Sequence, residues 1–290
     1  MSRDLLSRAR AELPALQRKF PERFRPDAKT RIMVWGTLAL LLAFFLLALW
    51  RLEIDTSRLL SGFGRLFHFL GLMVPPSPGN WARFLMFAQA LAETVAIAFL
   101  GTLLASLLAF PLGLLAARNA TINRLVQFAS RRFLDSVRGV DTLIWALIWV
   151  GVVGLGPFAG VLAIMTGDVG ALGKLFADAI EAADEKPVEG VTASGGNRIQ
   201  VILFGVLPQV LPVITAQALY FFESNTRSAT IIGVVGAGGI GLHLSEQIRT
   251  LEWPTVSFLV LMILAAVIVI DAISSRLRAR MISGSAAPTP

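Results

Sequence analysis

The residues best able to do chemistry form a polar cluster at positions 223–230, between two apolar stretches. An arginine among hydroxyl and amide groups can hold an oxyanion through charge-assisted hydrogen bonds. Glu223 and Arg227 are also spaced i, i+4, which is the separation of an ion pair on one helix face. The sequence leaves both interpretations open, an anion path or a structural ion pair. The cluster consists of Glu223, Asn225, Arg227, Ser228 and Thr230.

Two motifs resemble nucleotide-binding loops but lack the required context. GAGGIG at 236–241 has the glycine spacing of a dinucleotide-binding turn, which functions only between a strand and a helix. GDVGALGKL at 167–175 resembles a phosphate loop, but Asp168 replaces a glycine and Leu175 replaces the hydroxyl ligand of magnesium. We interpret the glycine-rich segment either as close helix packing or as the outer mouth of a pathway. Its residues are Gly233, Gly236, Gly238, Gly239 and Gly241.

The composition indicates an integral membrane protein. Of 290 residues, 55% are hydrophobic and 16% are charged, and the mean hydropathy is +0.70. The chain has no cysteine, and its two histidines, His68 and His243, lie far apart without a carboxylate cluster beside either. We therefore expect no catalytic residues, no metal site and no cofactor bound by this chain. The net charge of +7 is expected to mark a cytoplasmic membrane face rather than a nucleic-acid site.

Apolar runs predict an all-α protein with about six transmembrane helices, because a helix needs about 20 apolar residues to cross a bilayer. The middle run, 142–165, contains the helix-breaking sequence GLGPFAG. If the chain turns at 154–160 and returns to about Ala177, this run makes two short crossings instead of one. The other four expected spans are 32–50, 90–117, 199–222 and 256–273.

The distribution of arginine and lysine favours six spans over five. With six, both termini and the arginine-rich segments 118–138 and 276–280 face the cytoplasm, as the positive-inside rule requires. We thus expect a multi-pass protein of the cytoplasmic (inner) membrane of a prokaryote, in contact with lipid. Its expected parts are a basic cytoplasmic leader at 1–31, the first transmembrane helix and an outer interfacial loop at 32–84, a helical core at 85–280 with a cytoplasmic loop at about 178–198, and a cytoplasmic tail at 281–290.

The cytoplasmic loop at 178–198 is rich in acids, so the positive-inside rule does not explain its composition. We expect a short helix at about Val188 to Ser194, a break at Gly195 and Gly196, and a second helix that starts at Asn197 and enters the membrane. Such a projecting element suits docking to a cytoplasmic partner. A plain connector between two helices explains the same pattern, and the residues alone do not decide between the two.

The loop matches a known pattern in part. Glu189, Gly195, Leu207 and Pro208 fall in register with E-A-A-x3-G-x9-I-x-L-P, whereas Gly190, Val191 and Gly205 replace its two alanines and its isoleucine. The literal EAA at 181–183 is out of register, since Pro187 stands where its glycine should be. Together with GLGPFAGVLA, GVLPQVLP and RSATIIGVVGAGGIG, the pattern makes residues 93–280 resemble ABC importer permeases of the phosphonate-transporter family, which are related to methionine-importer permeases.

The resemblance implies a type I ABC importer permease and names its partners. Two copies of the chain would form a homodimeric pathway, and the loop of each would dock into a cytoplasmic ATPase that binds ATP and magnesium. An extracytoplasmic substrate-binding protein would deliver phosphonate or a related oxyanion, phosphite or phosphate, for transport by alternating access. Gly190 is expected to weaken the docking helix by up to about 1 kcal/mol. The implied ATPase-coupling residues are Val188, Glu189, Gly190, Val191, Gly195, Leu207 and Pro208.

Two other functions remain open from the sequence. A permease for methionine or another organic solute would share the loop and the partners. A stand-alone secondary carrier or channel would need no docking loop at all.

Overall fold

The computed structural model describes residues 28–52, 56–121 and 123–285, so most of the expected leader at 1–31 and half of the expected tail lie outside the described residues. Within these ranges every regular element is a helix. The chain divides into two units, Met1–His68 and Phe69–Pro290. The all-α class expected from the sequence is confirmed.

The first unit contains α3, Ala28–Arg51, which covers the predicted first span. Its side chains are apolar around the whole helix and exposed, with Phe44 and Trp50 at 70% and 75% exposed, as suits a helix surrounded by lipid. The expected outer loop contains a second helix, α4, Thr56–Leu72, which crosses the boundary between the two units.

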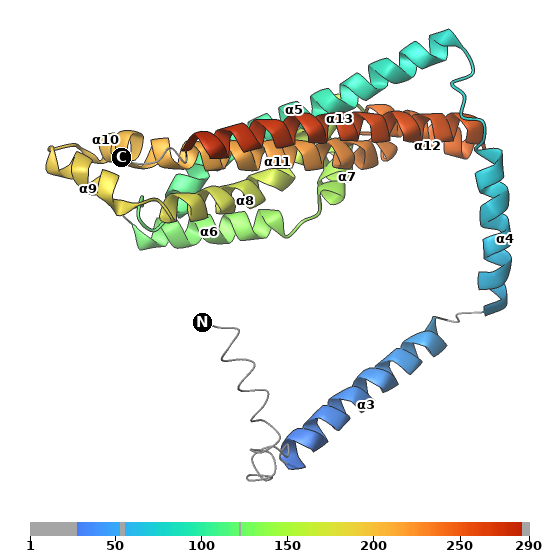
Figure 1. Cartoon of the computed structure of the whole chain (residues 1–290), viewed down its shortest axis with the longest axis horizontal. Helices are drawn as coiled ribbons and strands as arrows, with labels where there is room; N and C mark the ends of the chain where they lie inside the picture. Colours follow the sequence, from blue (N-terminus) through green and yellow to red (C-terminus); the bar gives the residue numbers. More distant parts are fainter. Residues whose placement is uncertain (1–27, 53–55, 122, 286–290) are drawn as a thin grey trace, which may run out of the picture. The chain divides into compact units, whose positions relative to one another are not determined.

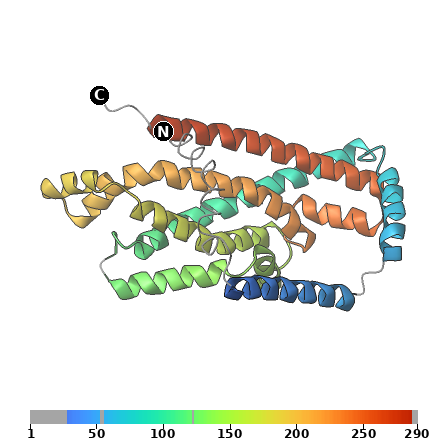
Figure 2. The same ribbon diagram turned by 60° about the horizontal axis from the view of Figure 1, so that its bottom comes forward.

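Four long helices run side by side in the second unit: α5, Trp81–Ala116; α8, Pro157–Glu181; α11, Leu207–Val234; and α13, Trp253–Ser285 (Figures 1 and 2). Small residues bring α5 and α8 close together. A Cβ atom on Gly101 would meet the side chain of Ile164, and one on Gly113 would lie 3.0 Å from the Cβ atom of Phe176. Close packing of α5 on α8 thus forms the centre of this unit.

The middle run is broken where the sequence predicted a turn. The helix α7, Thr142–Val153, ends at Gly154, and α8 begins after Gly156; both glycines have positive φ, 91° and 137°. The preceding helix α6, Arg124–Arg138, meets α7 at 85°, and the pair forms either one broken span or a re-entrant loop. With five helices long and apolar enough to cross a membrane, the described residues give five to six spans.

The arginine-rich segment 118–138, expected as a cytoplasmic connection between two spans, is for the most part the helix α6. Its charged residues gather on one side of the helix, and Leu134, one turn from both Arg131 and Arg138, is fully buried, while the side chain of Arg132 is 63% exposed. Leu134 fits against α8 where Gly173 has no side chain. The high charge of the segment concealed this amphipathic pattern.

The fifth and sixth spans extend beyond their predicted ends. The helix α11 runs to Val234 rather than ending at Phe222, because its polar residues do not interrupt the helix. Thr226 and Thr230 donate their hydroxyl groups to carbonyl oxygens one turn earlier, which satisfies them inside the helix. Before α11 lie the short α10, Arg198–Gln200, and the π-helix η1, Val201–Val206. After it lies α12, Ile240–Arg249.

Candidate functional site

A short helix, α9, Glu185–Ala193, projects at one end of the second unit, together with α10 (Figures 1 and 2). The carboxylate of Asp184 accepts a hydrogen bond from the backbone N–H of Lys186 (3.1 Å) and caps the start of α9. None of the residues of α9 is fully buried, and Val188 and Val191 are its half-buried members. The predicted loop helix is confirmed, with its start three residues earlier than expected.

The turn after α9 is fixed by two features. Gly195 has a φ of 84°, and the backbone N–H of Gly196 donates to the carbonyl oxygen of Val191 (3.0 Å). Asn197 and Gln200 then form a capping box, in which each side chain accepts a hydrogen bond from the backbone N–H of the other (2.9 and 2.7 Å). The predicted break at Gly195 and Gly196 and the restart at Asn197 are confirmed.

The remaining residues of the predicted coupling set lie where α9 meets the long helices. Val188 and Leu207 both pack against the buried cluster that includes Ile180. Glu189, Gly190 and Pro208 are exposed. A Cβ atom on Gly190 would meet nothing within 4 Å, so packing does not require a glycine there.

Gln209 holds the backbone of Asp184, the capping residue of α9. The backbone N–H of Asp184 donates to Oε1 of Gln209 (3.0 Å), and Nε2 of Gln209 donates to the carbonyl oxygen of Asp184 (3.2 Å). The same Nε2 donates to the carbonyl oxygen of Gly205 (2.7 Å). The sequence analysis missed this residue, although it directly follows Pro208 of the loop pattern. One amide thus joins α9 to the start of α11.

Arg131, in the middle of α6, and Glu181 join the ends of α5 and α8 near α9. Arg131 donates from Nη2 to Oε1 of Glu181 (2.7 Å) and from Nε to the carbonyl oxygen of Ala116, the last residue of α5 (3.0 Å). Glu181 Oε1 also accepts the backbone N–H of Arg118 (2.7 Å). Sequence reasoning counted these residues only as charges, since nothing local reveals a contact fifty positions apart.

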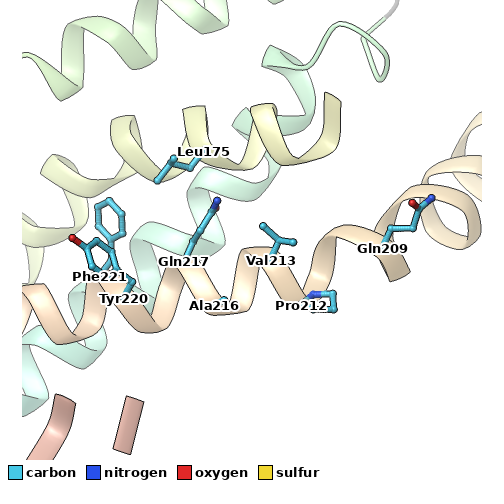
Figure 3. A pocket seen from close by; sticks show the side chains of 8 residues that line it. All are labelled: Leu175, Gln209, Pro212, Val213, Ala216, Gln217, Tyr220 and Phe221. Carbon is cyan, nitrogen blue, oxygen red and sulfur yellow. The ribbon is translucent and has the colours of Figure 1, made fainter. Parts of the chain in front are cut away.

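An open groove of about 460 Å³ runs along α11 beside α8 (Figure 3). Pro212, Val213 and Phe221 of α11 and Leu175 of α8 give it a mostly apolar wall. Gln217 points from α11 toward α8, and its Oε1 is buried without a hydrogen-bond partner. Gln209 lies at the end of the groove nearest to α9.

The structure divides the predicted polar cluster between different sides of α11. Asn225 is buried and donates from Nδ2 to Oγ1 of Thr102 on α5 (2.8 Å) and to the carboxylate of Asp168 on α8. Asn225 therefore binds three helices together. The hydroxyl groups of Ser228 and Thr230 donate only to carbonyl oxygens of α11 itself. A lone carboxylate in an apolar run, as at Asp168, is the signal that could have pointed to this contact.

Glu223 and Arg227 form the i, i+4 ion pair that the spacing predicts, with 3.6 Å between Oε1 and Nη1. A closer cation comes from α13, because Nη2 of Arg278 donates to Oε2 of Glu223 (3.0 Å). The sequence analysis had assigned Arg278 to the charges of the cytoplasmic tail. The structure places it inside α13, which continues to Ser285 instead of ending near position 273.

The glycine-rich segment is closely packed. Gly236, Gly238 and Gly239 have positive φ of 99°, 82° and 73°. The backbone N–H of Gly239 donates to the carboxylate of Glu93 on α5 (2.8 Å). Gly233 and Gly241 touch, since a Cβ atom on Gly233 would lie 3.0 Å from the Cα atom of Gly241. These contacts explain every glycine of the segment by backbone conformation or close approach.

Residues 109–283, more than half of the chain, match the family described as binding-protein-dependent transport system inner membrane component. The chain belongs to this family. It is a multi-pass permease of the inner membrane, and it is a transport component rather than an enzyme. Membership implies an ATPase and a substrate-binding protein as its partners. The matched residues include the helix α9 and the cluster around Glu223.

Two relatives carry names that state a transported anion. The permease is 38% identical over 244 residues to the phosphite transport system permease protein PtxC of Stutzerimonas stutzeri, covering 84% of this chain and 88% of the relative. It is 36% identical over 263 residues to the phosphate-import permease protein PhnE of Mycolicibacterium smegmatis, covering 90% of this chain and 49% of that longer relative. The predicted resemblance to permeases of this group is confirmed.

The fold of the permease is that of a solved methionine transporter subunit. A chain in a structure of the MetNI methionine ABC transporter in inward-facing conformations superposes with a TM-score of 0.61. The alignment covers 70% of this chain and 99% of that chain at 19% identity. The type I importer architecture expected from the sequence is thereby confirmed, and this likeness concerns the fold alone.

Proposed function

We propose that two copies of this permease, with an ATPase dimer and an extracytoplasmic binding protein, import phosphonate or a related oxyanion such as phosphite or phosphate. The observation that carries the proposal is the exposed helix α9, held through Gln209 to α11. A stand-alone carrier or channel has no need of such an element. The names of the relatives support an oxyanion as the substrate.

The contacts of α9 supply a route for mechanical coupling. The exposed surface around Glu189 docks to the ATPase, and closure of the ATPase dimer moves α9 as a rigid body. Gln209 and the packing of Val188 on the core pass this movement to α11. The Arg131–Glu181 pair passes it to α5, α6 and α8. The long helices then switch the pathway between its inward- and outward-facing forms.

Charge reversal at Glu189 tests the proposal. We expect Glu189→Lys to abolish co-purification of the ATPase and ATP-dependent phosphite uptake in proteoliposomes, because Glu189 is exposed on α9 and its change leaves the fold intact. Glu246→Lys is the matched control, since Glu246 is also exposed but lies on α12. Chemical cross-linking of the purified permease tests the homodimer.

Retained ATPase binding together with retained uptake in Glu189→Lys would contradict the proposed docking. Uptake of methionine instead of phosphite by the wild-type complex would contradict the proposed substrate.

A further inference from the structure

One carboxylate and two guanidinium groups meet between α11 and α13. Glu223 has a side chain that is 11% exposed, and it contacts Arg278 at 3.0 Å and Arg227 at 3.6 Å. The side chains of Arg278 and Arg227 are 22% and 49% exposed. The cluster carries one positive charge more than Glu223 neutralises, in helices that cross the membrane. Such excess charge is costly unless an anion or water reaches it.

Arg278 also has an unused hydrogen-bond donor. Its Nη2 donates to Glu223, but its Nη1 is buried and has no partner in the described residues. A buried guanidinium nitrogen without a hydrogen-bond acceptor is unfavourable. The group that would complete this site is therefore a hydrogen-bond acceptor. Each carboxylate oxygen of Glu223 faces one of the two arginines, so Glu223 does not supply an acceptor for Nη1 of Arg278.

Glu223 and Arg227 lie on the same face of α11 as the residues that line the groove, farther along the helix. Tyr220 of the groove precedes Glu223 by three residues and Arg227 by seven, so the three share one helix face. Asn225, in contrast, is buried toward α5 and α8. The half-exposed Arg227 gives the cluster an opening to the surface of α11.

We propose that Arg278 and Arg227 form a transient binding site for a tetrahedral phosphorus oxyanion on its way through the membrane. The inference rests on the proposed function and assigns a step of it to these residues. A phosphite or phosphate ion can accept two hydrogen bonds from the planar guanidinium of Arg278, including one from the unpartnered Nη1.

Glu223 acts as an internal competitor at this site. While the site is empty, its carboxylate neutralises the arginines, and an arriving oxyanion takes its place at Arg278. Repulsion between Glu223 and the bound anion keeps binding weak. A pathway needs such weak binding, because an ion that is held too tightly does not leave.

Kinetics of phosphite uptake test the proposal in the full complex with its ATPase and binding protein. We expect Arg278→Gln to raise the KM of phosphite uptake by roughly tenfold, the effect of losing a hydrogen bond from a charged group. We expect Glu223→Gln to lower both KM and maximal rate, because the competitor is removed and release slows. Arg276→Gln is the control, since Arg276 is exposed on the same helix.

The double variant Glu223→Gln with Arg278→Gln separates anion binding from a purely structural ion pair. It removes the Glu223–Arg278 pair as a whole and leaves only the half-exposed Arg227 without its partner, so a structural role predicts that uptake recovers relative to Arg278→Gln. The proposal predicts that uptake stays low while assembly and basal ATP hydrolysis match the wild type. Recovered uptake would overturn the proposal and leave the proposed function intact.

A lipid phosphate is the other source of the same chemistry. If Arg278 binds a lipid headgroup, the KM for phosphite stays unchanged in Arg278→Gln, and uptake by the wild type alone depends on the phosphatidylglycerol content of the vesicles. That result would also overturn the proposal. Absence of ATP-dependent phosphite uptake in the wild type would instead contradict the proposed function.

Discussion

Replacement of Gln209 by leucine tests whether the amide clamp transmits movement from α9 to α11. Leucine keeps a side chain of similar size on α11 but cannot form the three hydrogen bonds to Asp184 and Gly205. The two bonds to Asp184 are exposed and the one to Gly205 is half-buried, so each contributes at the lower end of the usual range. We estimate a loss of about 1–2 kcal/mol in total.

A loss of this size loosens the clamp without unfolding the protein. Domain stabilities are about 5–15 kcal/mol, so Gln209→Leu is expected to fold and to insert into the membrane. About 1.4 kcal/mol corresponds to a tenfold shift between the clamped and released arrangements of α9. The exposed surface of α9 around Glu189 does not change, and the ATPase is therefore expected to stay bound.

The assay is the ratio of phosphite transported to ATP hydrolysed in proteoliposomes. We expect this ratio to fall several-fold in Gln209→Leu, while ATPase co-purification stays at the wild-type level. Gln217→Leu is the matched control, because Gln217 lies on the same helix and groove but its Oε1 forms no hydrogen bond. An unchanged ratio in Gln209→Leu would refute the transmission through this amide, and loss of the ATPase would show that Gln209 acts in docking instead.

Three further variants have expected outcomes that thermal unfolding of the purified permease can measure. Gly190→Ala is expected to stabilise α9 by about 0.5–1 kcal/mol, since its Cβ atom meets nothing within 4 Å; a lower stability would contradict the helical, open position. Gly241→Ala is expected to be strongly destabilising, because its Cβ atom would collide with the carbonyl oxygen of Thr230. Asn225→Ala is expected to lower stability by about 1–3 kcal/mol, since Asp168 and Thr102 lose a buried partner; wild-type stability would argue against this three-helix contact.

The sequence predicted those elements whose bounds depend on neighbouring residues, such as an apolar run or a glycine. The apolar run at 32–50 gave α3. Gly154 ends α7 and Gly156 precedes α8, and both have a positive φ that other residues rarely adopt. The segment α6 was missed because its charges dominate a composition-based prediction, whereas the burial of Leu134 depends on Gly173, about forty positions away. Burial of this kind follows from packing and is not visible in the segment itself.

In the candidate sites, too, features set by neighbouring residues were predicted and contacts between distant segments were not. The helix α9 and its glycine turn follow from capping and turn residues, so the loop pattern located them correctly. The partners of Glu223 did not follow in the same way. Arg227 lies one turn away on the same helix and was predicted, while Arg278 lies 55 positions later and pairs with Glu223 only because α13 packs against α11.

The position of the contacts along α9 decides whether Gly190 weakens coupling. The clamp at Asp184 and the packing of Val188 both precede Gly190 in the chain. After Gly190, the turn is tied back to α9 by the hydrogen bond from Gly196 to Val191. Under the proposed coupling, force that enters at the exposed face of α9 therefore reaches these contacts with α11 through the first half of the helix. A more flexible backbone at Gly190 lies outside this route, and Gly190→Ala should stabilise the helix without changing the ratio of transport to ATP hydrolysis.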